Sequence, residues 1–244
     1  MKYLTQTENI TEEKAKDLDY GRVVSDNTDN SSYLVNYGHI HYNAIDMGLE
    51  SGTLWMDKNV GAEKDTDTGL YFQWGDTQGY TADEVGTKKR FSWSTYKYCK
   101  GTETSFTKYN CSVGNGYNGF TDGKVFLETI DDMALQNTHK FVVPTQKQFI
   151  ELINGCTYEW TTKDGVTGGL FTSNTNGNTL FFPVTQIADR SSLNGQQYGH
   201  YWANETIFQT YRKCNKFSVR EDSTYTYAIY KYYGICVRGV CKKG

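Results

Sequence analysis

The sequence predicts an α+β protein with small antiparallel sheets, two short helices and long loops. Helix patterns occur in the first 155 residues, whereas strand patterns dominate the C-terminal third, and this segregation is typical of the α+β class. Asn176-Gly177 lies between two strand-like runs, which is the strongest short signal for a β-hairpin. A chain of 244 residues has room for one large domain or two small ones.

The composition favours a folded core built on aromatic rings. Aromatic residues make up 15% of the chain, with 20 tyrosines among them. Disordered chains are poor in such residues, so we expect a folded protein. The net charge of −3 argues against nucleic-acid binding, which relies on neutralising phosphates. No run of apolar residues is long enough for membrane insertion.

Residues 1–45 are predicted to form an extended arm, and residues 46–244 the globular domain. Thr11–Leu18 begins with an N-cap residue and carries acids in its first turn, the pattern of a short polar helix. Tyr33–Tyr37 has the composition of a strand. Neither segment could bury a core alone, so we expect the arm to pack on its own domain or on a partner subunit.

Two short helices are predicted in the middle of the chain. Phe141–Val143 has the pattern of a buried strand, and a capping box of Thr145 and Gln148 follows it. The helix that begins there should end at Gly155. A second short helix is expected over Asp131–Gln136. The first helix presents an apolar face made of Phe149, Ile150, Leu152 and Ile153.

Strands account for most of the remaining chain. The run Gly169–Pro183 contains the Asn-Gly hairpin signal. Four further segments are rich in β-branched and aromatic residues: Tyr198–Asn204, Lys216–Arg220, Thr224–Tyr230 and Ile235–Val240. These strands complete the small antiparallel sheets.

Short motifs spread over residues 46–241 resemble the Fibrobacter succinogenes major paralogous domain. That family occurs in gut Bacteroidetes and their phages, and it is related to C-type-lectin-like folds. The matching pieces are Gly48–Trp55, Asn59–Ala62, Gly69–Gly75, Phe91–Trp93, Tyr96–Cys99, Thr107–Tyr109, Val143–Thr145, Phe149–Ile153, Trp160–Thr162, Thr175–Asn178, Tyr201–Trp202 and Tyr233–Arg238. The resemblance implies a C-type-lectin-like domain, in a version carried by a crAss-like phage that infects Bacteroidetes.

The chain departs from the family pattern at several positions. Glu50 stands where the family usually has proline, and Val142 and Val143 replace the usual Arg-Met before proline. Arg238-Gly-Val240 replaces Arg-Pro-Val. Ala203-Asn204 replaces Ser-Ser on the surface that such folds use for ligands. The last departure puts the identity of any ligand in doubt.

The candidate ligand contacts are aromatic and amide side chains in the C-terminal third. Aromatic faces stack on sugar rings, and amides and carboxylates pair with hydroxyl groups. Trp202 is the exception, because the family has it regardless of ligand, and a core position is favoured there. Alternate tyrosines of one strand could equally pack on a neighbour. The candidates are Tyr201, Trp202, Asn204, Glu205, Tyr225, Tyr227 and Tyr230.

Metal binding and catalysis have little support in the sequence. His39 and His41 alternate on one predicted strand and would share a face, so three copies about an axis would offer six imidazoles. Asp131 and Asp132 could bind Ca²⁺, although acids at a helix N-terminus have a simpler explanation. None of the six cysteines forms a C-x-x-C pair. No nucleophile and base are linked by spacing, so we expect no enzyme activity and no required cofactor.

The expected function is non-enzymatic display on a phage particle. Members of the family are usually exported, whereas the first residues here show neither an apolar signal segment nor a lipid-anchoring cysteine. A virion surface protein, such as a head fibre or capsid decoration, is made in the host cytoplasm and needs no export signal. This role reconciles a family that is usually found outside cells with a sequence that shows no export signal. We expect residues 1–45 to bind capsid or other virion proteins, the chain to form a homodimer or homotrimer, and the lectin-like domain to bind a host glycan or surface protein. The alternatives are a bacterial cell-surface adhesin or glycan-binding lipoprotein and a capsid cement protein without a ligand.

Overall fold

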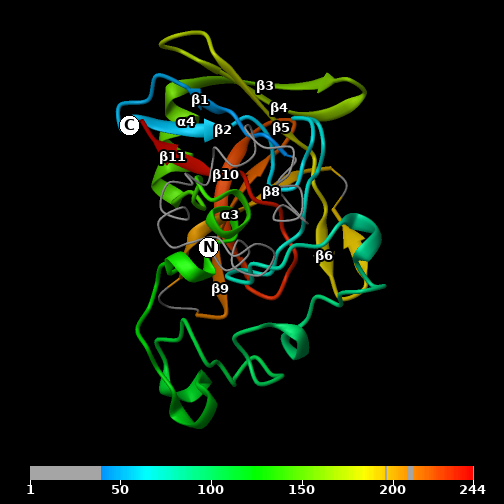
Figure 1. The fold of residues 1–244 in the computed structure, drawn as a ribbon, viewed down its shortest axis with the longest axis vertical. Helices are drawn as coiled ribbons and strands as arrows, with labels where there is room; N and C mark the ends of the chain where they lie inside the picture. The colour runs from blue at the N-terminus through cyan, green and yellow to red at the C-terminus, as the bar shows by residue number, and fades with distance from the viewer. Residues whose placement is uncertain (1–39, 196, 208–210, 244) are drawn as a thin grey trace, which may run out of the picture.

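The computed structural model describes residues 40–243 except residues 196 and 208–210 (Figure 1). The N-terminal helix and strand expected at Thr11–Leu18 and Tyr33–Tyr37 lie outside the described residues, as does His39. Within the described part, small antiparallel sheets surround two short helices, which agrees with the predicted α+β class. Neither helix of that part is long and apolar enough to cross a membrane.

The first sheet joins the two ends of the described chain. β2 (Thr53–Met56) lies in its centre and pairs with β1 (Ala44–Asp46) and β11 (Val240–Lys242), both antiparallel. Trp55 of β2 is fully buried. Because β1 crosses the expected domain boundary at residue 45, the last residues of the expected arm belong to the folded unit.

The second and third sheets carry most of the strand residues. β3 (Cys156–Lys163), β4 (Val166–Ser173) and β5 (Thr179–Pro183) form an antiparallel sheet in that order. The loop between β4 and β5 contains Gly177, whose φ of 75° is the left-handed value that an Asn-Gly turn needs. This confirms the predicted hairpin, although its loop is longer than the two-residue turn.

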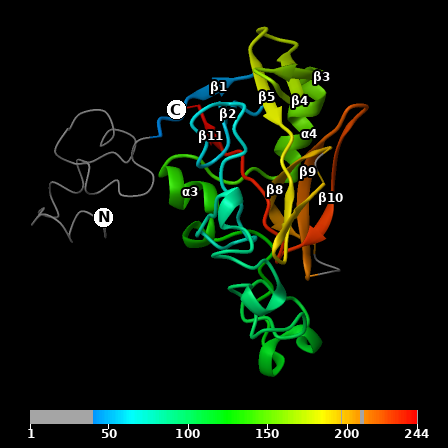
Figure 2. The ribbon, with the colours of Figure 1, turned by 90° about the vertical axis from the view of Figure 1, so that its right-hand side faces the viewer.

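The third sheet has the order β10-β9-β8 and lies at one side of the molecule (Figure 2). Its strands are β8 (Gly199–Thr206), β9 (Lys213–Val219) and β10 (Thr224–Tyr230). A separate hairpin of β6 (Ile187–Asp189) and β7 (Ser192–Asn194) is drawn in yellow in Figure 1. The segment predicted as a strand at residues 235–240 makes isolated bridges and joins a sheet only at its last residue.

Of the two helices, α4 begins at its predicted cap and α3 begins later than predicted. α4 (Gln146–Gly155) has the capping box of Thr145 and Gln148, and Thr145 accepts a hydrogen bond from the Gln148 amide. α3 (Met133–Thr138) starts two residues later than expected, because Asp132 is its N-cap. Ile150 is 44% exposed, so the predicted apolar face of α4 is narrower than its sequence pattern. In the described part of the chain, five single 3₁₀ turns lie in the long loops: η2 (Ala82–Glu84), η3 (Trp93–Thr95), η4 (Val113–Asn115), η5 (Tyr117–Gly119) and η6 (Thr129–Asp131).

Two clusters of rings form the core. In the first, Phe149 of α4 lies 5.2 Å from Trp55 and stacks on Phe217 of β9 at 4.6 Å between ring centroids. In the second, Trp74 meets Tyr109 edge to face at 4.9 Å. Aromatic pairs of this geometry stabilise by about 0.5–1.5 kcal/mol beyond their buried area. The rings therefore hold together elements that are too short to be stable alone.

A buried arginine ties the sheets together. Arg238 is fully buried, donates to Asn59 Oδ1 at 2.8 Å and to the Phe181 carbonyl at 2.9 Å, and lies over the Phe182 ring. The Nε, Nη1 and Nη2 groups of Arg238 all donate to acceptors inside the protein, so Arg238 is structural. The chain around η4 and η5 extends away from the sheets as a lobe at the lower end of Figures 1 and 2.

Candidate functional site

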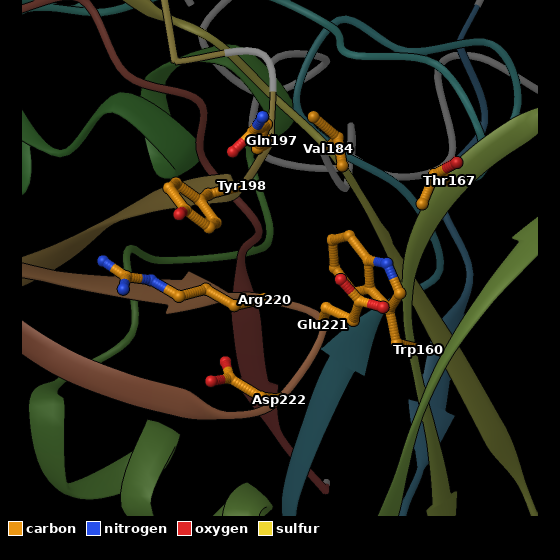
Figure 3. Close-up of a pocket in the computed structure, with 8 residues that line it drawn as sticks. All are labelled: Trp160, Thr167, Val184, Gln197, Tyr198, Arg220, Glu221 and Asp222. Carbon is orange, nitrogen blue, oxygen red and sulfur yellow. The ribbon is translucent and has the colours of Figure 1, made fainter.

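A cavity of about 560 Å³ opens where three separate parts of the chain meet. This volume lies within the range of small-ligand sites, roughly 300–1,000 Å³. Its walls come from the β3–β4 hairpin, from the segments that follow β5 and precede β8, and from the turn between β9 and β10 (Figure 3). The lining residues are Trp160, Thr167, Val184, Gln197, Tyr198, Arg220, Glu221 and Asp222.

Trp160 forms one aromatic wall because of its register in β3. Tyr158, two residues earlier on the same face, packs on the core ring of Phe171 at 5.1 Å. Trp160 continues that face past the end of the core and is only partly buried. It stands directly opposite Gly169, so no cross-strand side chain covers that part of its ring.

The turn after β9 brings charged groups to the same place. The Arg220 amide donates to the Ser223 carbonyl at 3.0 Å, which closes the turn. The Tyr158 hydroxyl donates to the Arg220 carbonyl and links this turn to the β3–β4 hairpin. Glu221 and Asp222 at the tip of the turn are exposed.

Arg220 is held between two tyrosine rings. Its guanidinium carbon lies 4.2 Å from the centroid of Tyr198 and 4.1 Å from that of Tyr225. Within the described part of the chain no carboxylate forms an ion pair with it, and its Nε is buried without a hydrogen-bond partner. Cation–π contacts fix the position of the group, but among residues 40–243, apart from the undescribed ones, no acceptor is hydrogen-bonded to it.

Lys216, His200 and Ser218 form a buried basic cluster under the neighbouring Tyr227 ring. Lys216 Nζ lies 2.6 Å from His200 Nδ1 and 2.8 Å from Ser218 Oγ, under the Tyr227 ring at 3.9 Å. Burial, with the nearby Arg220 charge, lowers the pKa of Lys216 to about 6. Burial and the neighbouring cations also lower the pKa of His200, to about 2. At neutral pH both groups are therefore uncharged, so Lys216 can donate to the neutral imidazole.

The lining combines the groups that recognise polyhydroxylated ligands. Trp160 and Glu221 stand on one side of the cavity in Figure 3, and Tyr198 and Arg220 stand on the other. Ring faces accept the C–H side of a sugar, carboxylates accept its hydroxyl donors, and a guanidinium donates to its oxygens. The Gln197 amide offers both a donor and an acceptor. Aromatic walls with a few polar groups are the usual composition of such sites.

Four of the predicted ligand contacts are taken up by the scaffold. Tyr201 and Trp202 are fully buried, and their polar atoms donate to the carbonyls of Pro183 and Phe72. This corrects the expectation that their rings face a ligand, and it agrees with the core position favoured for Trp202. The reason is that the first half of β8 is covered on both faces, so side chains on either face of the strand are buried there.

The next two predicted contacts hold other elements in place. Asn204 Oδ1 accepts from the Leu127 amide at 3.0 Å. Glu205 accepts from the Gln146 amide at 3.0 and 2.9 Å through its two oxygens and so stabilises the first turn of α4. Burial raises the pKa of Glu205. These contacts occupy the groups that were expected to meet a ligand.

The three predicted tyrosines of β10 are half-buried, and one of them supports the cavity. Tyr225 covers Arg220 and stacks on Tyr227 with centroids 5.0 Å apart. Tyr230 lies on the other face of the strand, near the β6–β7 hairpin, and belongs to a second cavity. The residues that line the first cavity were missed, although the acidic turn between two predicted strands was visible in the sequence as Glu221-Asp222.

The residues considered for metal binding have other partners. Asp131 accepts from Lys108 and from the hydroxyls of Tyr98 and Tyr109. Burial acts to raise its pKa, but these hydrogen bonds outweigh burial and lower it. Asp132 accepts from the amides of Leu135 and Val143, as expected for an N-cap. His41 is exposed, and the described residues contain no group of three or more metal-ligating side chains.

The cysteines are free thiols within the described part of the chain. Cys156, Cys214 and Cys236 are buried, and the other three are partly buried. Burial raises the pKa of Cys156 to about 11 and that of Cys99 to about 12. These thiols are protonated at neutral pH and behave as small apolar side chains.

Comparison of the chain with known protein families, curated proteins and solved structures gives no match.

Proposed function

We propose that this chain is a non-enzymatic, glycan-binding display protein, and that the cavity between Trp160 and Tyr198 is its ligand site. One observation carries the proposal. Two aromatic walls flank exposed carboxylates and a guanidinium whose Nε has no partner in the described structure. That combination suits a hydroxyl-rich ligand better than an apolar one, which would bring no hydrogen-bond donors to the Glu221 and Asp222 carboxylates.

The motif resemblance supports the same reading. We propose a C-type-lectin-like fold of the Fibrobacter succinogenes major paralogous type, with small antiparallel sheets, two short helices and long loops. In this proposal the domain is displayed on a phage virion, as a head fibre or capsid decoration, and residues 1–45 attach it to capsid proteins. Homo-oligomeric display would add avidity to a weak individual site.

A glycan array followed by calorimetry tests the ligand site. The full-length chain should bind a subset of glycans, with and without added calcium. Trp160→Ala should weaken that binding roughly tenfold, because a lost stacking ring costs about 1–1.5 kcal/mol. Tyr117→Ala is the matched control, since Tyr117 is 47% exposed and lies in the lobe at η5, in a different part of the chain. A blank array would favour the alternative of a cement protein without a ligand.

The place of display has its own test. Antibody labelling of purified particles should find the chain on the virion surface, and the assembled particle should lose it when residues 1–39 are deleted. Labelling of bacterial cells in the absence of phage would support the alternative, a cell-surface adhesin or glycan-binding lipoprotein. This labelling tests where the protein is displayed, independently of whether its cavity binds a glycan.

A further inference from the structure

A second cavity of about 560 Å³ lies between the β6–β7 hairpin and the edge strand β10. Its lining includes Ile187 and Ile229, which we call the apolar floor, and Tyr230 and Tyr233, which we call the aromatic wall. Asp189 and Lys213 also line it, so one acidic and one basic group enter the same space. None of these residues lines the proposed glycan site.

The acidic group lacks a donor. Asp189 Oδ1 is buried and accepts no hydrogen bond, and within the described chain Asp189 forms no ion pair. Leaving a buried acceptor unpaired costs about 1–3 kcal/mol, and more for a charged group. Most buried polar groups have a partner in the protein or in bound water. Among the described residues no hydrogen bond reaches either oxygen of this carboxylate, and Asp189 lines the cavity. A ligand's donor would therefore be stabilised beside Asp189.

The basic group is also without a carboxylate. Among the described residues Lys213 forms no ion pair, and its Nζ lies 5.0 Å from the centroid of Tyr230. A ring face leaves the donors of an ammonium group free for an anionic acceptor. The cavity thus offers an acceptor and a donor to whatever occupies it.

The aromatic wall is built rigidly. Tyr230 and Tyr232 are nearly parallel at 15°, and Tyr232 and Tyr233 lie 4.4 Å apart. Trp93 packs edge-on against Tyr232 at 4.9 Å. Rings held by one another on several sides lose little freedom when a ligand binds, which favours affinity. Such a wall would cover the apolar body of a small molecule.

From this arrangement we infer that the second cavity binds a small zwitterion with an apolar body, of the α-amino acid class. The ammonium group of the ligand pairs with the Asp189 carboxylate, its carboxylate pairs with Lys213, and its side chain lies on Tyr230 and Tyr233. The apolar floor distinguishes this ligand from a sugar, which would leave hydroxyl groups unpaired against Ile187 and Ile229.

Calorimetry with three probes on one carbon skeleton tests the inference. L-leucine should bind to the full-length chain, whereas leucinamide, which lacks the carboxylate, and N-acetyl-leucine, which lacks the ammonium charge, should each bind at least about tenfold more weakly. Asp189→Asn should reduce the preference for leucine over N-acetyl-leucine, and Lys213→Met should reduce the preference over leucinamide. Measurable binding of any of the three probes to a variant would show that this variant still folds.

Two results would overturn the inference. The first is no heat of binding for any probe while the chain melts cooperatively, which would leave water as the partner of Asp189. The second is leucine binding that neither variant alters. Trp160→Ala should leave leucine binding unchanged, so failure at this cavity and failure at the glycan site are separable.

Discussion

At the scale of single residues, the buried Lys216 is the least expected feature of the protein. It is fully buried, and its partners are an imidazole and a hydroxyl instead of a carboxylate. A lysine in this setting stays neutral because burial disfavours the ammonium form. Tyr227 covers Lys216 and stacks on Tyr225, which in turn holds Arg220. The protonation state of the cluster therefore bears on the proposed glycan site.

The lysine makes stability depend on pH in a defined direction. In the unfolded chain it titrates near 10.4, whereas in the fold its pKa is lowered to about 6. Between these values the unfolded chain holds a proton that the folded chain lacks, so the free energy of unfolding from this group rises with pH. His200 acts in the same direction from about pH 2, its folded value, up to its unfolded value near 6.5.

Lys216→Met should remove the lysine's contribution to the increase of the free energy of unfolding with pH. We expect a higher free energy of unfolding than in the parent at neutral pH, with a difference that shrinks as pH rises toward about 10. Ser218 and His200 stay paired in the variant, since they already lie 3.0 Å apart. Urea denaturation from about pH 6 to about pH 9 measures the difference. Lys64→Met, at an exposed position, is the control, and parallel curves for parent and Lys216→Met would contradict the account.

At the scale of elements, α4 shows how local sequence signals fix a helix. Thr145 accepts from the Gln148 amide at 3.2 Å, and the Gln148 side chain accepts from the Thr145 amide at 2.8 Å. Glu205 satisfies a further amide of the first turn. Caps of this kind satisfy donors that the helix itself cannot.

Thr145→Ala should lower the free energy of unfolding by about 1 kcal/mol, because it removes the side-chain acceptor at the N-cap. Equilibrium urea unfolding gives the value. Thr121→Ala removes the same atoms from an exposed position and should change stability by less than about 0.5 kcal/mol. Equal effects of the two substitutions would show that the cap contributes nothing beyond the loss of a threonine.

Elements with local signals were predicted well, and those set by distant contacts were not. The capping box of α4 and the Gly177 hairpin both depend on residues within one turn of each other. The helix α3 was also expected from local residues, but it begins two residues later than predicted. The isolated bridges of Ile235 with Phe72 and of Cys236 with Tyr201 depend on partners far away in the chain. A sequence window cannot reveal which strand will be covered on both faces, and this is why Tyr201 was expected at a surface.

At the scale of the whole molecule, the site depends on how the sheets are assembled. Trp160, Tyr198 and Arg220 are far apart in sequence and meet through tertiary contacts. One of these contacts is the hydrogen bond from the Tyr158 hydroxyl of β3 to the Arg220 carbonyl in the β9–β10 turn. No periodicity in the chain predicts that meeting. The resemblance pointed to β8, whose Tyr201 and Trp202 side chains belong to the core.

The sheet that joins β1, β2 and β11 predicts that the domain folds without the preceding arm. A chain that begins at residue 40 keeps all three strands. We expect it to melt within a few degrees of the full-length chain and to keep its glycan affinity, while losing attachment to virions. Differential scanning calorimetry measures the first property, and a large drop in the melting temperature would show that the arm is part of the fold.

The central claim is tested most directly by calorimetric titration of one array-selected glycan into the parent chain, Trp160→Ala and Tyr117→Ala. The account predicts that the parent and Tyr117→Ala bind alike, and that Trp160→Ala binds roughly tenfold more weakly. Equal affinity of all three proteins would place the ligand elsewhere on the molecule and contradict the account.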